Sequence, residues 1–314
     1  MSTTDFSSGG THIKTFLDLR CSPTLVGGIQ LASTFFAAVD ILLAITAFLG
    51  NSLILVALHK ESSLHPPSKL LYRCLATTDL LIGLVSQPLA ATHWMSLVHE
   101  HWSICRYTNG PAYITGVALS AVSLLTMAAI SVDRLLALLL GLRYKHIVTL
   151  KCLYIIVTLF WVLSLTFSLI AVFVNRITVL YIRIVIPFCL VISLVSYTKI
   201  YCILRHQQSR VKTYVQQQPS QQNTLDLARY RKALYSTLWV QSAFVVCYAP
   251  FYIVETAIAH TKTYSSYFIV LRKVAVVLVY FNSTLNPFLY CWKISEIRQA
   301  VKKTIRKALC CPWS

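Results

Sequence analysis

A set of polar side chains lies inside otherwise apolar stretches of this 314-residue sequence. Asp79 is in the middle of one such stretch, and hydroxyl or amide groups occur at similar depths in others. These are Asn51, Ser123, Asn282, Ser283 and Asn286. Asn282 and Asn286 are four residues apart and therefore share a helix face. A buried carboxylate with such neighbours either binds a sodium ion or is held by hydrogen bonds alone, and the spacing leaves both open.

The composition indicates that these residues are surrounded by lipid. Hydrophobic residues make up 56% of the chain and charged residues 12%, whereas a soluble domain carries about 25% charged residues. The net charge is +18, and the charged residues lie between the apolar stretches. A nucleic-acid-binding protein would gather them on one soluble face, so no nucleic-acid partner is expected. No metal-binding, nucleophile or phosphate-loop motif occurs, and the sequence predicts neither an enzyme nor a bound organic cofactor.

Seven apolar stretches are long enough to cross about 30 Å of hydrocarbon as helices. They are predicted at 33–58, 69–95, 111–140, 152–174, 177–204, 232–259 and 266–292. The expected fold is all-α, a seven-transmembrane helix bundle at 33–292, preceded by an N-terminal segment at 1–32. Between the fifth and sixth spans, the Gln-rich segment at about 205–231 contains Pro219 and is predicted to be a flexible loop.

The distribution of basic residues predicts the orientation. With the N-terminus outside, the cytoplasmic segments hold 20 lysines and arginines and the outer segments hold eight. This asymmetry follows the positive-inside rule. We therefore expect a multi-pass plasma-membrane protein whose residues 1–32 are extracellular.

Six short motifs follow one another along the chain, one in each of six spans. They are Gly50-Asn51, Leu75-x-x-x-Asp79, Asp133-Arg134, Trp161, Cys247-x-x-Pro250 and Asn286-Pro287-x-x-Tyr290. This pattern resembles the rhodopsin-like (class A) G protein-coupled receptors over nearly the whole chain. Leu142-Arg143-Tyr144 and Ser295-Glu296-Ile297-Arg298 resemble the melanocortin and adenosine-type group of that family.

The resemblance implies a receptor that transmits an extracellular ligand signal to heterotrimeric G proteins by opening the cytoplasmic face of the bundle. Asp79 and the five residues named with it match the family's sodium pocket, so Na⁺ is a candidate allosteric ion. The residues expected to act in activation and G protein coupling are Asp133, Arg134, Tyr197, Phe244, Tyr248, Pro250, Asn286, Pro287 and Tyr290. The alternatives are a non-signalling decoy receptor and a seven-span transporter. The intact motifs speak against the decoy, and the lack of internal repeats speaks against the transporter.

Two departures from the family pattern carry predictions. Tyr230 stands where many members have an acid that pairs with the arginine, which predicts a looser inactive state and raised basal signalling. The second outer loop has no cysteine, so a disulfide between Cys21 and Cys105 is a hypothesis beside two free thiols. Asn109-Gly110-Pro111 is interpreted as a turn with Pro111 opening the third helix, which would place Cys105 in the preceding loop.

A ligand pocket is expected between the outer halves of spans two, three, five, six and seven, and the ligand itself is unknown. Its candidate residues are His93, Trp94, Tyr113, Ser120, Tyr252, Glu255 and Tyr280. Gly116 occupies the place of the aspartate in amine receptors, and Tyr280 that of the retinal-binding lysine in opsins, so neither ligand is expected. A rim including Arg272 and Lys273 either favours an anionic ligand or consists of lysines and arginines that extend to the interface.

The tail at 293–314 is predicted to form a short amphipathic helix on the inner membrane surface. Its apolar residues recur every three or four positions and its basic residues lie opposite them, which suits an anionic leaflet. The apolar face comprises Ile294, Ile297, Val301, Ile305 and Leu309. Cys310 and Cys311 follow and are either palmitoylated or unmodified thiols.

Overall fold

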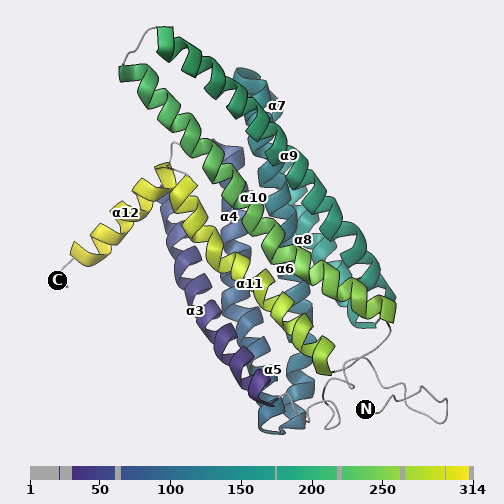
Figure 1. Ribbon diagram of the computed structural model, residues 1–314. Helices are drawn as coiled ribbons and strands as arrows, with labels where there is room; N and C mark the ends of the chain where they lie inside the picture. Colours follow the sequence, from purple (N-terminus) through teal and green to yellow (C-terminus); the bar gives the residue numbers. More distant parts are fainter. Residues whose placement is uncertain are drawn as a thin grey trace.

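The structure, a computed structural model, describes residue 21 and residues 30–60, 65–173, 175–217, 221–261, 266–293 and 295–310. Within these ranges the regular elements are all helices, and seven helical segments are long and apolar enough to cross a bilayer. Figure 1 shows them side by side as an elongated bundle. The predicted all-α, seven-span fold is confirmed.

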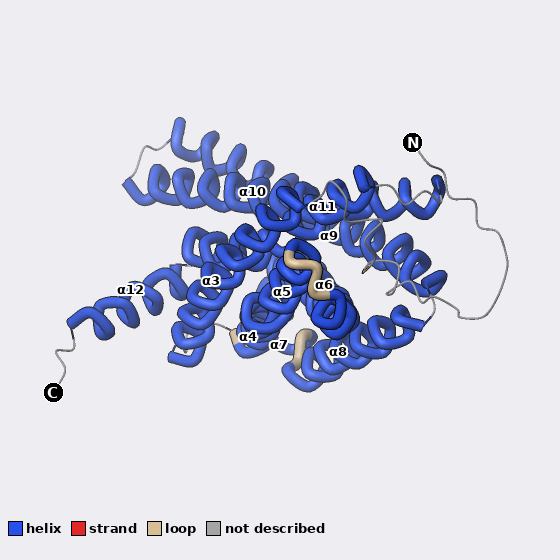
Figure 2. Tube along the Cα trace, turned by 90° about the horizontal axis from the view of Figure 1, so that it is seen from below, coloured by secondary structure: helices blue, strands red, loops and turns tan. Residues whose placement is uncertain are grey.

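Five of the spans are single helices that the sequence pattern places directly. They are α3 (Gln30–Lys60), α8 (Leu150–Phe173), α9 (Asn175–Gln217), α10 (Gln221–Thr261) and α11 (Ser266–Lys293). The third span, α6 (Trp102–Leu140), leads through the 3₁₀ turn η2 (Gly141–Arg143) into the short α7 (Tyr144–Ile147). The last described element is α12 (Ser295–Cys310), which leaves the bundle to one side (Figure 2).

The second span is interrupted by a π-helical turn. It consists of α4 (Pro66–Leu81), the turn η1 (Ile82–Ser86) and α5 (Gln87–Val98). Pro88 lies in the first turn of α5. Because proline has no amide proton, the preceding turn cannot close with the usual α-helical bond, and it widens instead.

The outward faces of the spans are apolar. On α8, the large side chains of Ile155, Leu159, Val162 and Leu163 are all exposed. A soluble protein rarely exposes a continuous apolar face, whereas hydrocarbon solvates one at no cost. The fold therefore places its apolar exterior in lipid and its polar residues inside the bundle.

The largest buried apolar cluster joins all seven spans. It includes Ile54, Leu71, Leu124, Phe244 and Val279, and it continues to Ile297 and Val301 of α12. The tail helix therefore packs Ile297 and Val301 against the end of the bundle at which α11 ends, which is named the inner end, the opposite one being the outer end.

Most of the segment at 205–231, for which a flexible loop is predicted, is helical. Residues up to Gln217 continue α9, and α10 begins at Gln221. Gln, Lys and Arg are favourable helix residues, and this segment contains no glycine, so the helices continue past the membrane span. In Figure 1 both helices project beyond the rest of the bundle.

The predicted start of the third helix is wrong. The helix begins at Trp102, and Pro111 lies inside it rather than opening it. Cys105 is consequently helical, with its amide bonded to the carbonyl of His101 at 3.0 Å. The nine residues before Pro111 form a helical extension that α5 and the disulfide described below hold in place.

Candidate functional site

A fully buried carboxylate lies in the middle of the bundle. Asp79 of α4 accepts hydrogen bonds at Oδ1 from the hydroxyls of Ser123 at 3.2 Å and Ser283 at 2.8 Å. Its Oδ2 accepts one from the side-chain amide of Asn286 at 2.6 Å. The donors come from α6 and α11, so one side chain connects three spans. Three of the five predicted neighbours meet here.

The other two predicted neighbours bind elsewhere. Asn51 donates to the carbonyls of Ala47 at 2.8 Å and Ser283 at 3.0 Å. Asn282 donates to the sulfur of Met127 at 3.1 Å. The Oδ1 atoms of both asparagines are buried without a partner among the described residues. Hard cations take oxygen ligands, and a carboxylate with two hydroxyls suits a sodium ion chemically.

The glycine before Asn51 permits close packing of α3 against α11. A Cβ atom at Gly50 would lie 2.9 Å from the ring of Pro287. Only a residue without a side chain lets the proline of α11 approach this closely. The first and last motifs of the sequence therefore form one contact.

At the inner end of α6, Asp133 is held by hydroxyl groups. Ser68 donates to its Oδ2 at 2.9 Å, and Tyr144 of α7 donates a short hydrogen bond to its Oδ1. The ring of Tyr144 packs beside His65 at 5.0 Å. Burial, followed by the bond to Asp133, raises the pKa of Tyr144 to about 12, so its phenol stays a donor at physiological pH.

The neighbouring Arg134 turns toward a different residue. Its Nε donates to the hydroxyl of Tyr72 at 3.2 Å, and its guanidinium lies 5.3 Å from the centre of the Tyr72 ring. Tyr72 in turn packs edge-on against Tyr290 at 5.1 Å. Sequence reasoning did not single out Tyr72, because a tyrosine in a span usually indicates packing.

Two predicted activation tyrosines line a small cavity together with Tyr72, the partner of Arg134. The cavity measures about 30 Å³, and Tyr197 of α9 and Tyr290 of α11 lie on its wall with Tyr72 and Asn286. Both tyrosines are almost fully buried. The structure therefore brings α4, α9 and α11 together at the place where the sequence predicts rearrangement.

The predicted switch residues of α10 form a buried pair. The rings of Phe244 and Tyr248 lie 5.2 Å apart, and both belong to the main core cluster. Pro250 follows half a turn later inside α10, as Pro287 does inside α11. Proline removes one backbone hydrogen bond from each helix, which gives each a weak point for bending.

The predicted pocket residues differ in their contacts. His93 lies beside the sulfur of Cys105, with Nδ1 to Sγ at 3.7 Å, and packs edge-on against Trp94 at 5.7 Å. Glu255 pairs with Arg272 across α10 and α11. Tyr113, Ser120 and Tyr252 are half-buried in the outer halves of α6 and α10.

Gly116 and Tyr280 fit one another. A Cβ atom at Gly116 would lie 2.6 Å from the hydroxyl of Tyr280. The tyrosine of α11 therefore fills the space that a side chain on α6 would need. Gly116 and Tyr280, the positions that differ from amine receptors and from opsins, are therefore in contact with each other.

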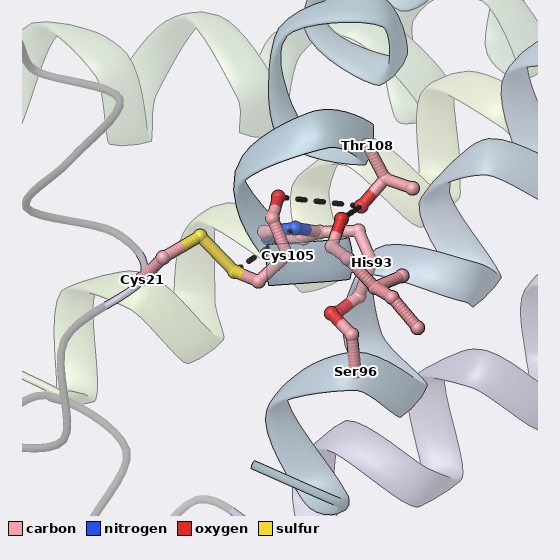
Figure 3. Close-up of a disulfide and its surroundings, with 6 residues drawn as sticks. Cys21, His93, Ser96, Cys105 and Thr108 are labelled. Carbon is pink, nitrogen blue, oxygen red and sulfur yellow. Dashed lines mark hydrogen bonds between the residues drawn. A yellow bond between two sulfur atoms is a disulfide. The ribbon is translucent and has the colours of Figure 1, made fainter. Parts of the chain in front are cut away.

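A disulfide joins Cys21 to Cys105, with Cα atoms 6.0 Å apart (Figure 3). Cys105 lies in the first turns of α6, and both cysteines are buried with Leu97 of α5 and the neighbouring Trp94 and Trp102. The structure thus attaches the segment before α3 to the outer end of the third span.

Sequence reasoning missed a buried ion pair between the first and last spans. Lys273 Nζ lies 2.5 Å from Asp40 Oδ2, and the side chains are 5% and 0% exposed. The ammonium also lies 5.3 Å from the Trp94 ring. Asp40 is an acid within an apolar stretch, a signal as clear as that of Asp79. The pairing leaves Arg272 and Lys273 each with a carboxylate partner rather than as an open basic rim.

The tail helix begins at Ser295 as a separate element. Ile297 and Val301 are buried against the bundle, while Lys302, Lys303 and Arg306 are exposed. Cys310 ends the helix, and Cys311 lies outside the described residues, as do Ile294 and the side chain of Leu309.

Comparisons with known proteins agree with this arrangement. The profile of the 7 transmembrane receptor (rhodopsin family) matches residues 50–181 and 173–290. Adenosine receptor A2a of Homo sapiens is 24% identical over 312 residues, which cover 88% of this chain and 73% of the relative. The same receptor of Equus caballus is 23% identical over 310 residues, with 87% and 73% covered.

The chain belongs to the rhodopsin family of seven-transmembrane receptors, since the profile matches well over half of it. The predicted resemblance, including its adenosine-type neighbourhood, is confirmed. The chain is therefore a multi-pass membrane receptor and not an enzyme.

Proposed function

We propose that this receptor activates heterotrimeric G proteins when its inner face opens around Arg134. The supporting observation is the arrangement of Asp133 and Arg134, which are adjacent yet held by separate residues. Opening requires Arg134 to leave Tyr72 and turn toward the cytoplasmic side. Tyr197 and Tyr290 then close the space it leaves.

Raised basal signalling follows from the partners of Arg134. Among the described residues, its guanidinium forms no ion pair with a carboxylate. The side chain of Tyr230, the residue in place of the usual acid, lies outside the described part. A neutral hydroxyl and an aromatic ring hold a cation less strongly than a carboxylate does, so the closed state is favoured by a smaller margin.

The orientation and anchoring proposals rest on charge. The N-terminus is extracellular in the plasma membrane, because the basic residues concentrate at the other side. The basic face of α12 lies on the anionic inner leaflet, and palmitoylation at Cys310 and Cys311 adds a second anchor. Sodium binds at Asp79 as an allosteric ion.

The proposal can be tested without a known ligand. Wild type, Arg134→Ala and Asp79→Asn are expressed at matched surface levels with an N-terminal epitope tag, and G protein activation is measured across the classes. Lys60→Ala is the matched control, because Lys60 is an exposed cation at the end of α3 outside the proposed machinery. Tag staining of intact cells tests the orientation.

We expect basal activation of one G protein class that Arg134→Ala reduces to background and Lys60→Ala leaves unchanged. Silence of the wild type at verified surface expression would contradict basal activity. A ligand panel would then follow, with adenosine included because the relatives are adenosine receptors. Silence with every ligand would favour a decoy or a transporter.

A further inference from the structure

The partner of Arg134 in this chain is a tyrosine of the second span. Arg134 Nε lies 3.2 Å from the Tyr72 hydroxyl, and the guanidinium also faces the Tyr72 ring. One of its terminal nitrogens, Nη2, is buried without a partner among the described residues. Asp133 accepts from Ser68 and Tyr144 instead of from this nitrogen.

Tyr72 is itself held firmly. It is 2% exposed, lies in the core cluster with Leu71 and Leu75, and packs edge-on against Tyr290 of α11. A side chain fixed on both sides presents its hydroxyl and ring face in one orientation. It is therefore suited to hold the flexible arginine rather than to follow it.

We infer that Tyr72 is the positioning residue that retains Arg134 in the closed state, through its hydroxyl and its ring face together. This inference rests on the proposed coupling function and names the restraint within it. In receptors that carry an acid at the base of the sixth helix, an ion pair would retain the arginine. Here the restraint comes from α4 instead, so it does not depend on the inner end of α10.

The geometry also gives an order of effects. Tyr72→Phe keeps the ring under the guanidinium and removes only the hydroxyl. Tyr72→Leu removes both contacts. Loss of a hydrogen bond to a charged group changes an equilibrium by about ten-fold or more, so each step should raise the open fraction.

The test measures ligand-free G protein activation at matched surface expression. We expect Tyr72→Phe to raise the basal signal several-fold and Tyr72→Leu to raise it further. Tyr154→Phe is the matched control, since this tyrosine is 56% exposed on the outer face of α8. In an Arg134→Ala background, Tyr72→Phe should change nothing, because the residue it restrains is absent.

A second measurement does not depend on signalling. Thermal unfolding of purified wild type, Tyr72→Phe, Arg134→Ala and the double variant forms a double-mutant cycle. Coupling in this cycle supports the contact, and additivity of the two changes overturns it. Coupling together with an unchanged or lowered basal signal in Tyr72→Phe also overturns the restraint, because the contact is then structural only.

Failure of the two ideas can be told apart. If the wild type signals and Arg134→Ala abolishes the signal while Tyr72→Phe has no effect, the restraint fails and the coupling function stands. If no variant, Tyr72→Leu included, signals above cells lacking the receptor either without ligand or with the ligand panel, the coupling function itself fails and the restraint fails with it.

Discussion

The two ends of the bundle hold their charged residues in different ways. At the outer end, Lys273 pairs with Asp40, Arg272 pairs with Glu255, and a disulfide fixes Cys105. At the inner end, Asp133 and Arg134 are each held by neutral hydroxyls. Breaking a buried ion pair costs more than breaking one hydrogen bond to a charge. The outer end is therefore held more firmly than the inner end, which is the difference that the proposed opening at the inner end requires.

The two outer ion pairs connect α11 to different neighbouring helices. Arg272 and Lys273 are consecutive on α11, yet one binds α10 and the other binds α3. The seventh span is thereby attached to both of its neighbours at the same level. In the proposed function, a movement of α10 would have its fixed point there and its free end at the opposite end of the bundle.

The largest expected effect is loss of the buried pair. Lys273→Ala leaves Asp40 charged and uncompensated inside the bundle, which should lower stability by about 3–5 kcal/mol. Thermal unfolding of the purified receptor measures this loss. Arg272→Ala is the matched control and should cost less, because its pair with Glu255 is 20% and 13% exposed.

A double variant distinguishes charge from packing at this pair. Asp40→Leu combined with Lys273→Met replaces two charges by apolar groups of similar size, which should restore most of the stability. Equal losses of stability in Lys273→Ala and Arg272→Ala would contradict the expectation that the more buried ion pair contributes more to stability.

The next effect concerns the disulfide. Cys21→Ser with Cys105→Ser opens a crosslink between positions 84 residues apart, and such a loss costs about 2–4 kcal/mol. Reduced surface expression and a lower unfolding temperature should result, with Cys152→Ser, an exposed free cysteine, as control. If peptide mapping under non-reducing conditions finds both thiols alkylatable, the outer end lacks its covalent tie.

A smaller effect is expected at the inner end. Tyr144→Phe removes one donor from Asp133 while Ser68 remains, which should cost about 1.5 kcal/mol. The raised pKa of Tyr144 means that the folded state favours the protonated phenol. Its contribution is complete below the usual value of 10 and is lost as the pH rises through about 12.

The difference between Tyr144→Phe and wild type should therefore be the same at pH 6 and pH 8.5, chosen as round values below the pKa of a free tyrosine, about 10. Ser68→Ala supplies the companion measurement at the other oxygen. A loss as large as that of Lys273→Ala would remove the contrast between the two ends.

The sequence predicted the fold and most of the Asp79 cluster, because both depend on patterns within single helices. Apolar length marks the spans, and a polar residue in an apolar stretch marks a buried site. The sequence does not indicate which residues pair across the bundle. Asp40 and Lys273 are 233 residues apart, and nothing local connects them.

Sequence patterns also do not specify the direction in which a side chain points. The position of Arg134 followed from its motif, but its partner Tyr72 depends on a rotamer that only packing selects. Local rules favour proline at a helix start, whereas Pro111 lies inside α6. The helix begins ahead of Pro111, at Trp102. Contacts with residues distant in the sequence, such as the disulfide to Cys21, hold this extension in place.

The smallest effect lies midway between the two ends. Asp79 connects α4, α6 and α11, so a cation there would reinforce the closed bundle between its fixed and opening halves. Sodium at ten times its Kd should stabilise the purified receptor by about 1.4 kcal/mol relative to equal potassium. Asp79→Asn should remove this difference, while Asp40→Asn at the outer end should preserve it. Equal stabilisation by both salts would leave Asp79 held by hydrogen bonds alone, and the two ends would then be linked by α11 without an ion.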